Sequence, residues 1–521
     1  MEFTIKKIFN TLPQRFRADK AAGYHGIFHF ELEDEKNQKD LFTVIISAAG
    51  CEVTESLVGI ANCTIKTKTE IYIGIETGKI KAQDAILSGK IQVDNFTELI
   101  NYSKFFRKLE AEEKHLNISE VQTITRKPES GPLKGLKVLD FTRLLPGPLA
   151  TMLMADMGAE VIKIEAPEYY DYTRNFPPQI GGESAAYLAF NRSKRSLSLD
   201  YSSQEGKAII LGMLEDVDIL IEQFRPGVMQ KMGLAYEDVK EINPKLIYVS
   251  VTGYGHTGPY ANLAGHDLNY ITFAGLLSGN QYTDPQLPLV QMADIAGGSY
   301  MAVIACLSAV YARNNTGKGQ FVDVSMLDGV MPLNVNAAAL NWATGKPVQR
   351  DESFLSGGLV NYNIYRCKGN RFVALGTLED KFWVKFCEVI GKPEWKNRIL
   401  AKNREELNSY KKDLEELFMT RELNYWVDLG FKHDLLLNAV YEMDEVEKDP
   451  HIIAREMIVE QEHPTAGKIK SIGIPLKFSD TKAKISWPPP LLGEDSLAIM
   501  QEAGVSKETI KELISKGLLK I

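Results

Sequence analysis

Short apolar runs alternate with helical stretches through the middle of the chain. Four of these runs have the length of a buried strand and lie at residues 136–142 (LKVLDFT), 159–167 (AEVIKIEAP), 217–224 (VDILIEQF) and 245–251 (KLIYVSV). Continuous apolar runs separated by helices are typical of parallel strands that are covered on both faces. The pattern therefore predicts an α/β fold with a parallel sheet in a large domain over residues 132–340.

The residues on either side of this large domain predict a smaller domain, a C-terminal segment, a separate N-terminal unit and a linker. Residues 355–455 mix strand patterns with charged helices, and we expect them to form a smaller α+β domain. Residues 456–521 return to strands and end in a helical segment, which we expect to rejoin the large domain. Residues 1–112 predict a separate α+β unit. Residues 113–131 are polar and aperiodic, which is typical of a linker.

Two segments of the first unit have clear periodicity. An amphipathic helix is expected over Ile5–Asp19. Apolar and polar residues alternate from Cys63 to Ile73, which predicts a half-buried strand over that whole stretch.

Charge and cysteine content exclude several functional classes. The net charge of −8 gives no overall attraction to nucleic acid or to an acidic membrane. None of the five cysteines forms a CxxC pair, so we expect no zinc site, no disulfide framework and a reducing, cytoplasmic location. No apolar run is predicted to span a membrane, and the N-terminus lacks the apolar region of a signal peptide.

A glycine-rich loop follows the fourth apolar run. Gly253, Gly255 and Gly258 match the spacing of a dinucleotide-binding fingerprint. That fingerprint needs a helix that opens at its third glycine, because the helix N-terminus holds the pyrophosphate. Pro259 and an irregular stretch follow instead, so we expect no NAD cofactor.

Four titratable residues stand where α/β proteins commonly place their chemistry. His266 and Asp267 follow the glycine-rich loop, Asp294 begins a long apolar helix, and Glu379 precedes a helix of the smaller domain. Loops after the strands of a parallel sheet often carry catalytic groups. An ordinary structural role stays open for the carboxylates, because aspartate is a common helix cap and glutamate favours the first turn.

Five polar residues form candidate phosphate contacts. Asn191, Arg192, Lys194 and Arg195 cluster before an alternating segment, and Arg225 follows an apolar run. Such groups are solvated surface by default. An acidic protein that binds a phosphate-rich ligand nevertheless needs a local basic patch of this kind.

Taken together, these pieces resemble the class III CoA-transferases. The resemblance covers residues 131–521. It is carried by several ordered stretches, namely LKVLDFTRLLPGPLATMLMADMGAEVIKIEAP, NRSKRSLSLDY, DILIEQFRPGVMQKMGL, INPKLIYVSVTGYGHTGPY, TGKGQFVDVSM and HPTAGKIKSIGIPLKFSD. It implies a Rossmann-like large domain, a smaller α+β domain and an interlocked homodimer whose sites lie between the large domain of one subunit and the small domain of the other.

Within that family the chain is similar to the α-methylacyl-CoA racemase branch. The racemase pattern GHDxNY is met by Gly265–Tyr270, and ADFxGG is met by Ala293–Gly298. Its glutamate in the smaller domain is met by Glu379, which follows Tyr365–Gly369. The resemblance implies an epimerase that inverts the α-carbon of a 2-methyl-branched or related acyl-CoA by 1,1-proton transfer.

The same resemblance implies a role for each site residue. His266 and Asp294 would act on opposite faces of the α-carbon, and Glu379 would orient His266. The backbone N–H of Asp267 would stabilise the enolate oxygen. The CoA arm would lie on the basic residues named above. No metal or redox cofactor is implied, since CoA enters as part of the thioester substrate.

Two other functions stay open. One is CoA transfer between carboxylic acids, with Asp267 as the nucleophile that forms a mixed anhydride. The other is a non-catalytic carrier of acyl-CoA or lipid. The N-terminal unit is similar to the sterol carrier protein 2 (SCP2) lipid-binding domain, on the stretches FHFELED and GIETGKIKAQDAILSGKIQV. That similarity implies an apolar site for a fatty acyl chain or a sterol-like lipid.

Overall fold

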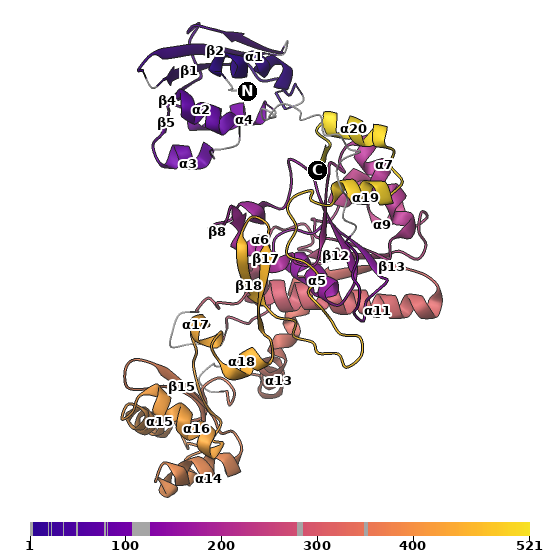
Figure 1. Cartoon of the computed structure of the whole chain (residues 1–521). Coiled ribbons are helices and arrows are strands. Elements are labelled where there is room, and N and C mark those ends of the chain that lie inside the picture. The colour runs from indigo at the N-terminus through magenta and orange to yellow at the C-terminus, as the bar shows by residue number, and fades with distance from the viewer. Residues whose placement is uncertain are drawn as a thin grey trace. The chain divides into compact units, whose positions relative to one another are not determined.

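The computed structural model describes residues 4–106, apart from 19, 22, 35, 48–49, 78–79 and 81, together with residues 126–278, 285–348 and 353–521. The chain divides into two compact units, Met1–Val121 and Gln122–Ile521 (Figure 1). Most of the predicted linker lies outside the described residues. Its last part belongs to the second unit, because Arg126 forms an ion pair with Glu494.

The first unit is a five-stranded sheet, in its described part, that is covered by helices. The sheet order is β3-β2-β1-β4-β5, and β1 pairs with β4 in parallel while the other neighbours are antiparallel. The elements are α1 (Ile5–Arg15), β1 (Gly26–Glu33), β2 (Lys39–Ser47), β3 (Gly50–Thr54), β4 (Cys63–Lys68), α2 (Thr69–Glu76), α3 (Ala82–Leu87), β5 (Ile91–Val93) and α4 (Phe96–Lys104).

The core of the first unit is aromatic. Phe9 of α1 stacks on Phe42 of β2 with ring centroids 4.0 Å apart, and Phe30 of β1 lies beside both Tyr72 and Tyr102. The strand predicted from Cys63 to Ile73 is wrong in its second half, because the chain turns into helix α2 at Thr69. The apolar residues at the end of this stretch, among them the buried Tyr72, fit a helix as well as a strand. The apolar pattern alone therefore did not distinguish a strand from a helix over this stretch.

The large domain of the second unit is built on a mainly parallel sheet. Its described strands run in the order β13-β12-β11-β6-β7-β10-β19, and β19 alone is antiparallel to its neighbour. The strands are β6 (Lys137–Asp140), β7 (Glu160–Glu165), β10 (Arg195–Leu199), β11 (Ile219–Glu222), β12 (Ile247–Thr252), β13 (Gln320–Ser325) and β19 (Leu519–Lys520). The predicted α/β fold is therefore confirmed.

Helices cover both faces of this sheet. They are α5 (Pro146–Asp156), α6 (Ala185–Phe190), α7 (Gln204–Met213), α8 (Val228–Met232), α9 (Tyr236–Val239), α10 (Asp267–Phe273), the π-helix η3 (Ala293–Tyr300), α11 (Met301–Thr316), α12 (Met326–Val330) and α13 (Val335–Thr344). Val249 of β12 packs in one core with Met154 of α5 and Cys306 of α11. Tyr248 points to the opposite face, where its hydroxyl donates to the Leu234 carbonyl between α8 and α9.

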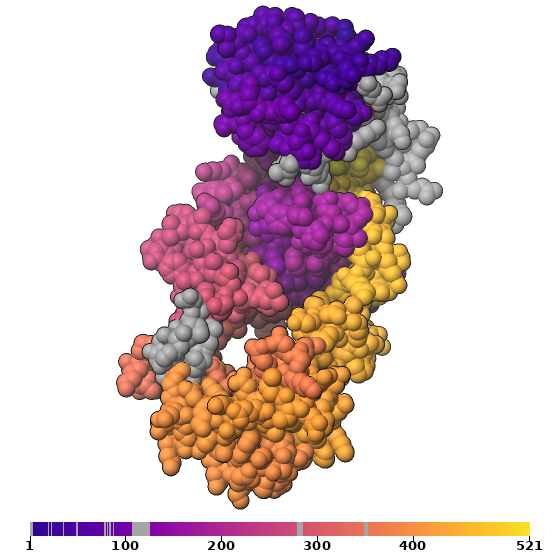
Figure 2. Space-filling model, turned by 90° about the vertical axis from the view of Figure 1, so that its left-hand side faces the viewer, coloured from indigo at the N-terminus to yellow at the C-terminus, as the bar shows by residue number. Residues whose placement is uncertain are grey.

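The smaller domain and the C-terminal segment complete the second unit. The smaller domain holds β14 (Tyr362–Arg366), β15 (Phe372–Gly376), α14 (Asp380–Val389), α15 (Arg404–Phe418), α16 (Leu423–His433), β16 (Leu437–Ala439), α17 (Met443–Val446) and α18 (Pro450–Ala454). The C-terminal segment holds β17 (Ile458–His463), β18 (Gly467–Ile472), α19 (Ser496–Glu502) and α20 (Lys507–Ser515). This segment, yellow in Figure 2, lies against the large domain, where Ser196 N–H donates to Asp495.

One helical stretch among the described residues, Ala293–Thr316, has the length and apolar composition of a membrane span. This differs from the prediction that no segment does. The stretch is η3 followed by α11, and its alanine, isoleucine, valine, leucine and cysteine residues raise its mean hydropathy. Because it packs against α5, β12 and β13, its apolar character serves the core of the large domain.

Candidate active site

The structure brings His266, Asp267 and Asp294 together at one edge of the large domain. His266 precedes α10, and its backbone N–H donates to the Asn269 side chain at 3.0 Å. Asp267 is the first residue of α10. Its Oδ1 accepts the backbone N–H of Ala293 at 2.7 Å and of Asp294 at 3.1 Å. The starts of α10 and η3 are thereby joined across 27 positions of sequence.

Asp294 carries the most perturbed carboxyl group of this edge. Its side chain is half-buried, and no described residue donates a hydrogen bond to its carboxylate oxygens. Burial, and after it the neighbouring charge of Asp267, together raise the pKa of Asp294 to about 7. A carboxyl group with this pKa can gain or lose a proton near neutral pH.

The π-helix η3, which carries Asp294, packs closely against two other helices at Gly297 and Gly298. A Cβ atom on Gly297 would lie 2.2 Å from the Met326 carbonyl oxygen of α12, and one on Gly298 would lie 2.7 Å from Cβ of Pro146. Both positions therefore exclude a side chain. Single π-helical turns are rare and occur frequently at functional sites, where the wider turn changes the direction of a side chain.

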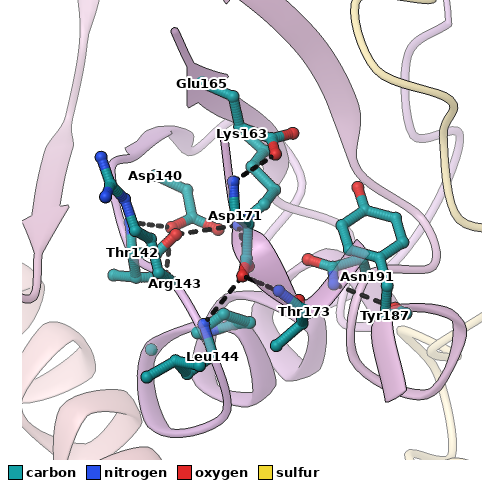
Figure 3. A network of polar contacts seen from close by, with 12 residues as sticks. Asp140, Thr142, Arg143, Leu144, Lys163, Glu165, Asp171, Thr173, Tyr187 and Asn191 are labelled. Atoms are coloured by element: carbon teal, nitrogen blue, oxygen red, sulfur yellow. Dashed lines mark hydrogen bonds and ion pairs between the residues drawn. The ribbon is translucent and has the colours of Figure 1, made fainter. Parts of the chain in front are cut away.

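A buried polar network holds the loop that leads into Pro146 (Figure 3). Lys163 donates to the Thr142 carbonyl at 2.8 Å and pairs with Asp171 at 3.2 Å. Asp171 in turn accepts the N–H of Leu144 at 3.2 Å. Because this loop runs directly into Pro146, the network also fixes the surface on which η3 rests.

Three basic residues predicted to bind phosphate are instead internal. Arg192, Lys194 and Arg195 are at most 2% exposed. Arg192 pairs with Asp156 at 2.8 Å, and Lys194 pairs with Asp140 at 3.1 Å, while burial lowers the pKa of Lys194 to about 8. The structure therefore places these side chains inside the domain, where the charges of two of them are already balanced, and their contact with phosphate stays a prediction.

The remaining members of the cluster follow the same pattern. Arg195 pairs with Glu160 at 2.6 Å and with Glu502 of α19 at 2.7 Å. Asn191 is buried, donates to the Tyr187 carbonyl at 3.0 Å and accepts from Lys194 at 2.8 Å. The cluster joins the sheet, α5 and the C-terminal segment rather than facing a ligand.

Arg225 is the predicted basic residue that stays exposed. It follows β11 and lines a cleft of about 370 Å³ together with Glu222, Tyr236 and His256. Arg143, which was not predicted, is half-exposed at the end of β6, and its guanidinium lies 5.1 Å from the Phe224 ring centre. The sequence feature that could have indicated Arg143 is its position directly after the predicted strand at 136–142.

Glu222 and His256 were also not predicted. Glu222 is 3% exposed at the end of β11, and burial raises its pKa to about 7. His256 Nε2 lies 2.7 Å from the Ser250 hydroxyl, which also contacts Glu222. The signal for Glu222 was an acidic residue at the end of an otherwise apolar run.

Glu379 lies apart from the other predicted catalytic residues. It is exposed and precedes α14 in the smaller domain. Among the described residues of a single chain, no contact joins Glu379 to His266. Its predicted role as the partner of His266 therefore stays a prediction that requires a second subunit.

Comparison with known proteins identifies the family of this fold and site. Residues 133–496 match the model of CoA-transferase family III, and residues 7–97 match the SCP-2 sterol transfer family. The chain belongs to CoA-transferase family III. This family III enzyme acts on acyl-CoA and carries an N-terminal SCP2 domain.

Relatives of this family III enzyme differ in activity. Human succinyl-CoA:glutarate CoA-transferase is 34% identical over 74% of this chain and 90% of its own length. Human alpha-methylacyl-CoA racemase is 30% identical over 74% of this chain and 97% of its own length. A CAIB/BAIF family protein from Brucella suis is 30% identical, with a TM-score of 0.63, over 72% of this chain and all of that chain. Most of the similar curated proteins are CoA-transferases.

Proposed function

We propose that the family III region transfers CoA between carboxylic acids and that Asp294 is the nucleophile. The observation that supports this proposal is the half-buried carboxyl group of Asp294, which receives no hydrogen bond from a described residue. The activities of the similar CoA-transferases support it as well. Asp267, which the sequence offered as the nucleophile in the alternative of CoA transfer, is less suitable because its Oδ1 already accepts two backbone N–H groups.

The proposed transfer proceeds through covalent exchange on Asp294. The carboxylate attacks the thioester carbonyl, the C–S bond breaks, and CoA thiolate leaves an acyl–aspartyl anhydride. The thiolate then attacks the aspartyl carbonyl and releases the donor acid. An acceptor carboxylate then attacks the carbonyl of the aspartyl-CoA thioester, the C–S bond breaks, and CoA thiolate leaves a second, acceptor–aspartyl anhydride. The thiolate attacks the acceptor carbonyl of this anhydride, which forms the new acyl-CoA and releases the Asp294 carboxylate.

A second candidate is epimerisation at the α-carbon, as in the racemase branch. The observation that favours it is His266, which stands directly before the residue that contacts the backbone of Asp294. The carboxyl group of Asp294, with a pKa of about 7, and the imidazole of His266 form a suitable pair: one group removes the proton from the α-carbon, and the other returns a proton to its opposite face. The backbone N–H of Asp267 would stabilise the enolate oxygen.

The second candidate needs a homodimer. Glu379 would reach His266 from the smaller domain of a second copy, since no contact within one chain joins them. Large apolar side chains on α11 and α13 are available for such an interface, with Tyr311 71% and Trp342 79% exposed. Burying exposed aromatic groups of this size favours association.

A single experiment separates the two candidates. One enantiomer of a 2-methylacyl-CoA is incubated in heavy water with and without a free dicarboxylic acid. Transfer yields a new acyl-CoA only when the acid is present and leaves the α-proton in place. Epimerisation yields α-deuterium and both enantiomers without any acid. Proton NMR and chromatography of the thioesters record both outcomes.

Substitution of His266 sharpens this test. His266→Ala is expected to lower α-deuterium exchange by about 10²-fold or more if the imidazole transfers the proton. CoA transfer through Asp294 should stay close to the wild-type rate. His433→Ala, at the end of α16 in the smaller domain, is the control and should leave either reaction unchanged. A variant that loses transfer and exchange together would contradict the assignment of separate roles.

We also propose that the SCP2 domain binds a fatty acyl chain or a sterol-like lipid and supplies long-chain substrate. A fragment of residues 122–521 keeps Arg126 and its ion pair with Glu494. It should retain activity on short-chain thioesters, because the proposed reacting groups all lie within it. The KM for long-chain thioesters should rise. Loss of activity on every chain length would contradict this separation of roles.

A further inference from the structure

Asp267 stands at the contact between two helices whose starts form the site. Its side chain belongs to α10, while the two N–H groups that donate to its Oδ1 belong to Ala293 and Asp294 of η3. Those N–H groups have no partner within η3, because the first N–H groups of a helix lack intrahelical acceptors. Asp267 therefore caps a helix that lies far away in sequence.

This cap fixes the residue that carries the reacting carboxyl group. The N–H of Asp294 itself is one of the two donors, so the backbone at Asp294 cannot rotate without losing the hydrogen bond at 3.1 Å. On the other side, η3 rests on α12 and α5 at Gly297 and Gly298, where no side chain would fit. Asp294 is thus held at its first N–H group and again one turn later.

Asp267 also carries a charge of the same sign as Asp294. Burial and this charge, in that order, raise the pKa of Asp294 to about 7. Tyr270, on the same helix as Asp267, is buried and lies near both carboxyl groups and Arg225. His266 is the remaining titratable group at the start of α10.

Other charged groups on the elements packed against η3 are engaged or exposed. They are Asp156 on α5, paired with Arg192; Asp323 on β13, which accepts the His256 N–H; Arg313 on α11, paired with Asp218; and Asp328 on α12, which is exposed. Asp267 is therefore the charge among the described residues that acts on Asp294.

We propose that Asp267 is a positioning residue, which holds Asp294 through the backbone of η3 and whose charge sets the pH range in which Asp294 reacts. This inference rests on the proposed reaction at Asp294, whichever acyl-CoA is the substrate. It applies equally to nucleophilic attack and to proton abstraction, because both need the ionised carboxylate.

The conservative variant Asp267→Asn separates charge from hydrogen bonding. The amide oxygen can still accept both N–H groups, while the negative charge is removed. The pKa of Asp294 should fall toward the ordinary range of aspartate, so the acidic limb of the activity profile should move to lower pH by about one pH unit. Asp267→Ala removes the acceptor too, and its kcat should fall by about 10²-fold with little change in KM.

A readout without turnover keeps this test independent of the proposed function. A water-soluble carbodiimide labels protonated carboxyl groups, and peptide mass spectrometry measures the labelling of Asp294 in the full-length chain across a pH series. In Asp267→Asn the pH at which labelling of Asp294 declines should move downward. The matched control is Asp449→Asn, because Asp449 accepts two backbone N–H groups in the same way at the start of α18, at 2.9 and 3.1 Å.

The possible outcomes are distinct. A downward shift of labelling in Asp267→Asn, absent in Asp449→Asn, supports the inference even if neither proposed reaction is detected. An unchanged labelling profile overturns the electrostatic part. Full activity of a folded Asp267→Ala overturns the positioning part. Thermal unfolding of each variant shows whether a loss of activity comes from loss of the fold.

Discussion

Asp294→Asn should reduce turnover of acyl-CoA by about 10⁴-fold or more, which is the order of loss seen when a reacting side chain is removed. Asparagine has the same shape, so η3 and its hydrogen bonds to Asp267 should persist. The amide can neither attack a thioester carbonyl nor remove an α-proton. The loss is therefore expected in kcat, with the affinity for acyl-CoA close to that of the wild type.

The measurement combines initial rates with binding of a non-hydrolysable acyl-CoA thioether by calorimetry. The control is Asp444→Asn, which alters an exposed aspartate paired with Lys448 on the surface of the smaller domain. It should keep both rate and affinity. If Asp294→Asn retained a tenth of the wild-type rate, Asp294 would not be the reacting carboxylate and the proposed function would lose its main support.

Lys194→Met should destabilise the large domain by about 3–5 kcal/mol, the usual cost of removing one partner of a buried ion pair. Asp140 would lose its partner at 3.1 Å while staying 0% exposed. Lys163 also acts on Asp140 and should offset part of the cost. Urea unfolding, followed by tryptophan fluorescence, measures the free energy of unfolding.

Two further variants test this explanation. Lys194→Met combined with Asp140→Asn should regain part of the lost stability, because the buried charge without a partner is removed. Lys516→Met breaks surface pairs with Glu205 and Glu512 and should cost less than about 1 kcal/mol. A stable Lys194→Met variant with a raised KM for acyl-CoA would restore the phosphate-binding role expected from the sequence.

The sheet was predictable from the sequence because its strands have a local signal. The runs at 136–142, 159–167 and 217–224 contain β6, β7 and β11, and the run at 245–251 covers β12 except for Thr252, since strands buried on both faces are continuously apolar. Helix α2 was missed because the alternation up to Ile73 fits both structures. Local sequence patterns were therefore most reliable for strands whose two faces are both buried.

The basic cluster shows why part of the site could not be predicted. In sequence, neighbouring Arg192, Lys194 and Arg195 look like a solvated or ligand-binding patch. Their carboxylate partners include Asp156 and Glu502, which stand 36 and 307 positions away. No periodicity connects residues at such separations, so only the folded chain shows that these charges are internal.

The sequence predicted which residues belong to the candidate site but not how their side chains and backbones contact one another. Family motifs indicated His266, Asp267 and Asp294 as site residues. They did not indicate that the Asp267 side chain caps η3, because that hydrogen bond joins a side chain to the backbone of a distant helix. They also gave no signal for the π-helical turn, which depends on close packing at Gly297 and Gly298.

The pairing of β19 with β10 has a consequence for how the chain folds during synthesis. All described strands of the first unit lie within its first 93 residues, so that unit can fold as soon as it leaves the ribosome. Strand β10 ends at Leu199, but its outer neighbour begins only at Leu519. At a synthesis rate of roughly 5–20 residues per second, β19 is made on the order of tens of seconds after β10. During that interval β10 is an open edge that can pair wrongly with another nascent chain, and chaperones have time to act on it.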